Sequence, residues 1–107
     1  MNAQRRAEKL SRLSLQLEDL FSEVSAYGAH RALPSEVADR IASTAGEIMV
    51  ELSDQRGDPV ARGAIEDARR LREAARTLCP EPAKVAAAGR TLASDLEQVI
   101  REDKRAA

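Results

Sequence analysis

Apolar side chains recur through the first quarter of the chain at alternating steps of three and four residues. They are Leu10, Leu13, Leu17, Leu20, Val24 and Tyr27. Such steps place side chains on one stripe of an α-helix. Gly28 follows the stripe, and glycine is common just beyond a helix C-terminus. The pattern predicts a helix over residues 3–27.

A second stripe with the same steps follows a short loop. It consists of Ala38, Ile41, Ala45, Ile48 and Leu52. Ser35 is predicted to cap the helix N-terminus, and Glu36 favours the first turn through the helix dipole. Gly46 costs about 1 kcal/mol relative to alanine inside a helix, so we expect another helix to approach closely at this position. The predicted helix covers residues 36–54.

Two further segments complete the pattern. Asp58-Pro59 is typical of an N-cap followed by the first helical residue, and Pro80 ends the segment, so a third helix is predicted over residues 59–79. Its stripe is mostly alanine, which implies close packing: Ala61, Ala64, Ala68, Leu71, Ala75 and Leu78. A fourth helix is predicted over residues 82–104, with an apolar side of Val85, Ala88, Gly89, Leu92, Leu96 and Val99.

No stretch alternates apolar and polar residues with the period of two that a β-strand requires. Four helices joined by short loops predict an all-α protein, an antiparallel up-down four-helix bundle. An alternative is a pair of helical hairpins that completes its bundle only in a dimer. A chain of 107 residues corresponds to one domain, which we expect to span residues 1–107.

The composition indicates the cellular location and the source of the protein. No run approaches the ~20 apolar residues of a membrane-spanning helix, and the basic N-terminus is not followed by the apolar region of a signal peptide. The single Cys79 forms no intrachain disulfide, so we expect a cytoplasmic protein. The 14 Arg against 3 Lys and the 20 Ala are encoded by GC-rich codons, which favours a bacterial or phage source.

The chain contains few of the residues that a catalytic, metal or cofactor site requires. A structural zinc site needs about four Cys or His ligands, but the chain has one Cys79 and one His30. His30 is expected in an exposed loop, and Cys79 is expected to be a small buried apolar residue. The five glycines form no phosphate-binding loop. We therefore expect no enzyme activity, no cofactor and no metal.

Helix carboxylates leave one enzymatic alternative. The acidic residues Glu47, Glu51, Glu66 and Asp67 flank the Gly57-Asp58 turn. This arrangement is faintly similar to the all-helical nucleoside triphosphate pyrophosphohydrolases, which bind magnesium through a Glu-Glu-x-x-Glu turn and a Glu-x-x-Asp turn. The resemblance implies a degenerate site, because Ser43 and Thr44 replace the first two glutamates. Arg69 stands where the aspartate belongs.

A row of arginines raises a nucleic-acid alternative. Arg62, Arg69 and Arg76 are seven residues apart and so lie along one side of the third predicted helix. Glu66 and Glu73 lie between them, which is typical of a solvated face with weak ion pairs. With a net charge of −1 and only two aromatic residues, neither counterion release nor base stacking is well supported. Nucleic acid is therefore not the expected partner.

Apolar residues outside the stripes carry the leading hypothesis. Leu15 and Val50 lie opposite their own stripes and Ile100 lies beside its stripe, so we expect all three to face solvent, and Phe21 flanks the stripe of its own helix. A contiguous exposed apolar face marks a protein-binding surface. Leu15, Phe21, Val50 and Ile100 therefore predict a small interaction module, an adaptor, regulator or inhibitor that binds another protein or forms a homodimer.

Overall fold

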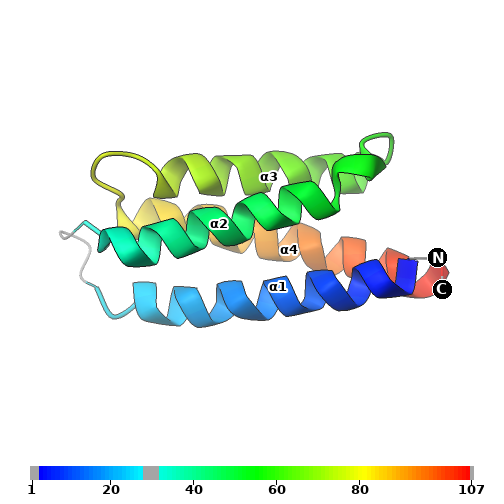
Figure 1. Cartoon of the computed structure of the whole chain (residues 1–107), viewed down its shortest axis with the longest axis horizontal. Coiled ribbons are helices and arrows are strands. Elements are labelled where there is room, and N and C mark those ends of the chain that lie inside the picture. Colours follow the sequence, from blue (N-terminus) through cyan, green and yellow to red (C-terminus); the bar gives the residue numbers. More distant parts are fainter. Residues whose placement is uncertain (1–2, 28–31, 107) are drawn as a thin grey trace.

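The computed structural model describes residues 3–27 and 32–106, and helices account for most of this part of the chain (Figure 1). No strand occurs in these two ranges. The elements are the helices α1 (Ala3–Val24), α2 (Ser35–Glu51), α3 (Pro59–Ala75) and α4 (Pro82–Ala106), with a short 3-10 helix, η1 (Ser53–Gln55), between α2 and α3.

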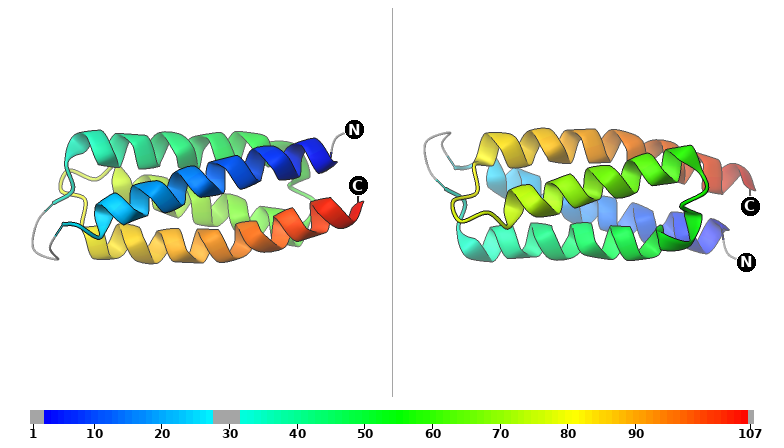
Figure 2. Two further views of the ribbon diagram at one scale, coloured as in Figure 1. Left: turned by 90° about the horizontal axis from the view of Figure 1, so that it is seen from below. Right: turned by 90° about the horizontal axis from the view of Figure 1, so that it is seen from above.

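The four helices form an up-down bundle. Each packs against two others: α1 and α3 both contact α2 and α4, so the pairs α1–α3 and α2–α4 lie on the diagonals. Successive helices run in opposite directions, which brings both termini to the same end (Figures 1 and 2). This confirms the predicted four-helix bundle. The helices of one chain enclose the core by themselves, so hairpins that complete a bundle only in a dimer are not what forms.

The predicted stripes build the core. Five stripe residues of α1 are buried: Leu10, Leu13, Leu17, Leu20 and Val24. The whole stripe of α2 is buried as well. On α3 the buried apolar side chains are four alanines and one leucine, Leu71. The buried large side chains of α4 are Val85, Leu92, Leu96 and Val99. Because α3 presents mostly methyl groups, the leucines and isoleucines of its two neighbours fill most of the space around it.

Helix starts follow the predicted capping in one case of two. The Asp58 carboxylate accepts a hydrogen bond of 3.1 Å from the Val60 backbone N–H, and Pro59 opens α3. The prediction for Ser35 was wrong, because α2 begins at this residue. Pro34 occupies the cap position without any side-chain hydrogen bond.

The predicted end of the third helix was also wrong. α3 stops at Ala75, where the Arg76 N–H bonds the Arg72 and Glu73 carbonyls, and residues 76–81 form a connection. In this connection the Pro80 carbonyl accepts a 3.0 Å hydrogen bond from Leu33. Leu78 therefore leaves the stripe and is 99% exposed, and Cys79 is exposed rather than buried.

The other boundaries differ by smaller amounts. The first helix ends at Val24 instead of residue 27, and Tyr27 packs half-buried against the core from the following turn. The second ends at Glu51, and its expected last turn is the 3-10 helix η1. Gly28 and His30 lie outside the described residues.

A close helix approach occurs at a different glycine from the one predicted. A Cβ atom placed on Gly46 meets no atom within 4 Å, so the expectation for this residue was wrong. A Cβ on Gly89 of α4 overlaps the ring of Phe21 from α1. Only a residue without a side chain leaves room for this ring, which is how α4 admits the aromatic side chain of α1.

Gly89→Ala is expected to lower the free energy of unfolding by about 1 kcal/mol. Displacing the Phe21 ring lowers the free energy of unfolding by about 1–3 kcal/mol. The better helix propensity of alanine raises it by about 1 kcal/mol. Gly46→Ala is the matched control, because only the propensity gain of about 0.5–1 kcal/mol remains there. Urea denaturation of both variants measures the difference. Equal stabilisation by the two substitutions would contradict the close contact.

Candidate functional site

The face shared by α1 and α4 carries a long, open groove. Two hollows of about 760 and 680 Å³ lie along it, and they share Glu18 and Ala93, so they are continuous. On α4 the lining runs from Pro82 to Lys104, a helical length of about 33 Å. Eight of the twenty lining residues are serine or alanine: Ser11, Ser14, Ser22, Ser25, Ala83, Ala86, Ala93 and Ser94.

Three of the predicted binding residues lie in this groove. Leu15 is 60% exposed and shares one hollow with Ile100, while Phe21 lines the other. Ile100 and Phe21 are half-buried because both also pack against the core, so the expectation that Ile100 faces solvent holds only in part. The groove therefore presents one exposed leucine between two anchored apolar side chains.

Val50 belongs to a different surface. It is 73% exposed on α2 and lines a separate hollow together with Lys9, Ser43, Gly46, Glu47 and Arg72. No second large apolar side chain lines this hollow, whereas Leu15 shares its hollow with Ile100. The four predicted residues therefore divide into a group of three on the α1–α4 face and one isolated valine.

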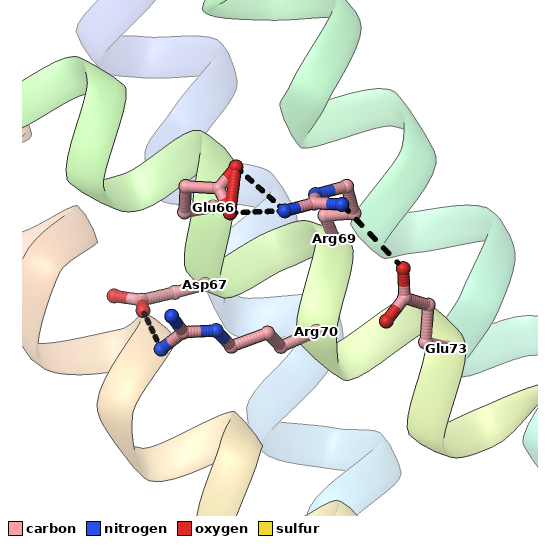
Figure 3. Close-up of polar contacts among 5 residues, drawn as sticks. All are labelled: Glu66, Asp67, Arg69, Arg70 and Glu73. Atoms are coloured by element: carbon pink, nitrogen blue, oxygen red, sulfur yellow. Dashed lines mark hydrogen bonds and ion pairs between the residues drawn. The ribbon is translucent and has the colours of Figure 1, made fainter.

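Arg69, the middle residue of the arginine row on α3, is paired with two glutamates of its own helix. Arg69 hydrogen-bonds Glu66, and its Nη1 lies 3.7 Å from the Glu73 carboxylate (Figure 3). The hydrogen bond from Arg69 lowers the pKa of Glu66 and raises the pKa of Arg69 itself. With both its neighbours acidic, Arg69 offers little positive potential to a phosphate backbone. Nothing in this arrangement favours the nucleic-acid alternative.

The carboxylates of the pyrophosphohydrolase-like pattern do not converge. Glu51 forms an ion pair of 3.2 Å with Lys9, and Glu47 is exposed on the outside of α2. Across residues 3–27 and 32–106, no three His, Cys, Asp or Glu side chains come close enough together to hold a metal ion. Magnesium is held by converging oxygen ligands, so no observation in the described part of the chain favours the hydrolase alternative.

Charged side chains inside the bundle are what sequence reasoning missed. Asp67, which is 7% exposed, and Asp95 meet between α3 and α4, and Arg6 pairs with the buried Asp103 between α1 and α4. A signal was present, because these positions continue the helical stripes. Asp67 stands three residues after Ala64, Asp95 three after Leu92, and Asp103 four after Val99. A charged residue at a stripe position indicates a buried polar contact.

A comparison of the chain with protein-family models, with curated proteins and with solved structures finds no significant match. Within the described residues, no helix combines the length and the apolar character needed to cross a membrane.

Proposed function

We propose that the protein is a non-enzymatic interaction module that binds a second copy of itself through the α1–α4 groove. The observation that carries the proposal is Leu15, which is 60% exposed in a groove that also contains the half-buried Phe21 and Ile100. Removing such side chains from water provides the main favourable free energy of association.

The shape of the groove suits a helical partner. Serine and alanine side chains along both helices allow another helix to approach closely, and the groove extends over most of α4. An amphipathic helix binds such a groove through side chains three and four residues apart. In a dimer each copy supplies the α1–α4 face to the other, so the same patch occurs on both sides of the interface.

Two unpaired charges favour a second copy over an unrelated partner. Glu18 and Arg90 line the same hollow, and neither has an ion-pair partner within the described residues. A two-fold axis beside them sets each Glu18 opposite Arg90 of the other copy, which forms two identical ion pairs. Such pairs contribute orientation more than affinity.

The remaining expectations follow from this role. A dimer that presents its outer faces to further proteins acts as an adaptor, regulator or inhibitor. The exposed, single Cys79 fits a reducing compartment such as the bacterial cytoplasm, where thiols stay unpaired.

Leu15→Glu is expected to raise the dimer dissociation constant at least about tenfold, because a carboxylate must then be desolvated at the interface. Sedimentation velocity over a range of protein concentrations measures this change. Val50→Glu is the matched control, since it places the same charge on an exposed apolar position outside the groove. A wild type that remains monomeric at high concentration, or equal weakening by both variants, would exclude this interface.

Charge exchange tests the identity of the partner. Glu18→Arg and Arg90→Glu are each expected to weaken the dimer, and the double variant is expected to restore it, because the two pairs are then re-formed with reversed sign. A partner other than a second copy has no reason to tolerate the double variant. Failure of the exchange to restore the dimer would contradict the proposed two-fold arrangement.

A further inference from the structure

Asp67 is a buried carboxylate without an adequate partner. Its side chain is 9% exposed, and its Oδ2 atom accepts no hydrogen bond. The nearest cation is Arg70 on the same helix, whose Nη1 lies 4.0 Å from Asp67 Oδ1 and whose side chain is 69% exposed (Figure 3). A buried polar atom that lacks a hydrogen bond destabilises the folded state. We therefore expect a proton or another hydrogen-bond donor to be bound at Asp67 Oδ2.

The group that faces Asp67 from the neighbouring helix is a second carboxylate. Asp95 of α4 lies over α3 beside Gly63, where its Oδ2 is 3.8 Å from the place of a Cβ. Gly63 precedes Asp67 by four residues and so lies on the same side of α3. Asp95 therefore lies beside the face of α3 that carries Asp67, and its negative charge acts on the Asp67 carboxyl group. Two ionised carboxylates have only acceptor atoms, so neither satisfies the other.

We propose that Asp67 and Asp95 share one proton and act as a pH-sensitive latch between α3 and α4. With the proton bound, a carboxyl group donates to a carboxylate across the helix interface. When the proton leaves to solvent, two negative charges face each other at the same place and the interface loosens.

The residues around Asp67 and Asp95 favour a proton as the group that the two carboxylates share. α2, the other long helix packed on α3, buries no charged side chain, and η1 buries none of its residues, Asp54 included. Glu66 on α3 adds to the negative potential, and Arg70 opposes it from solvent. Burial and the neighbouring carboxyl group of Asp95 together raise the pKa of Asp67 to about 6, in the manner of other close carboxylate pairs.

The direction of the pH effect follows from this pKa. Asp67 in the unfolded chain titrates near the ordinary value of about 3.9, so between about pH 4 and pH 6 the folded protein binds more protons than the unfolded one. The contribution of Asp67 to the stability of the folded protein therefore falls as the pH rises through this window. Above pH 6 the repulsion is present in full, and below pH 4 both states are protonated.

Carbon-13 NMR titration of the side-chain carboxyl carbons of the intact protein tests the latch. Asp67 is expected to titrate with a midpoint near pH 6, and Asp95→Asn is expected to lower this midpoint because the amide donates to the ionised Asp67. Asp39→Asn changes an exposed residue of α2 and is the control, because it is expected to leave the Asp67 midpoint unchanged. An Asp67 midpoint at the ordinary value, or one that Asp95→Asn does not move, would overturn the proposal.

Thermal unfolding provides a second readout. Asp67→Asn is expected to raise the melting temperature at pH 7 by about 5–10 °C over the wild type and to change it little at pH 4. Melting with added magnesium or calcium separates a proton from a metal ion. A cation that stabilises the wild type at pH 7 but not Asp67→Asn would show that the pair binds metal and would overturn the shared proton.

Discussion

Leu71→Ala is expected to lower the free energy of unfolding by about 2–5 kcal/mol. Leu71 is fully buried and is the only large aliphatic side chain that α3 buries, since its other buried apolar residues are alanines. No neighbour on the same helix can fill the cavity. Small domains have stabilities of about 5–15 kcal/mol in total, so this one truncation removes a large part of the stability of the bundle.

Leu78→Ala is the matched control for this prediction. The two leucines are seven residues apart and occupy equivalent positions in the apolar stripe, but Leu78 is 99% exposed beyond the end of α3. Its truncation is expected to change the stability by no more than about 0.5 kcal/mol. Denaturant unfolding followed by circular dichroism measures both variants. Comparable losses from the two would mean that α3 continues past Ala75.

The same pair of leucines marks how far periodicity predicts this fold. Steps of three and four residues located four helices and their buried faces, because the burial of a stripe depends only on side-chain spacing. Helix ends depend on competing contacts that spacing does not contain. The Pro80 carbonyl accepts a hydrogen bond from the Leu33 backbone N–H in another part of the chain, and Leu78 lies in the same connection, outside the helix.

The candidate groove was predictable in part for a related reason. Leu15, Phe21 and Ile100 were identified as lying off the stripes, but spacing within one helix does not say which helices become neighbours. Pairing of α1 with α4 brings these three together, whereas Val50 points outward from α2. The burial of Asp67 and Asp103 was not predicted, because spacing was read from apolar residues alone and both positions carry a charge.

Arg6→Met is expected to lower the free energy of unfolding by about 2–3 kcal/mol, because it leaves the Asp103 carboxylate buried without its counter-charge. The Arg6 guanidinium holds Asp103 with two hydrogen bonds, the Nε–Oδ2 bond being 2.7 Å long. Hydrogen bonding to Asp103 also raises the pKa of Arg6. The loss is smaller than for a fully buried pair, since 17% of the Arg6 side chain remains exposed.

Two further variants separate the buried charge from the loss of the pair itself. Arg101→Met removes an ion pair of α4 whose members are about two-thirds exposed, and it is expected to cost less than about 1 kcal/mol. Arg6→Met combined with Asp103→Leu removes both charges and is expected to recover most of the stability. If the double variant is as unstable as Arg6→Met alone, the penalty does not come from the unpaired carboxylate. The contact would then act by packing the two helix ends together.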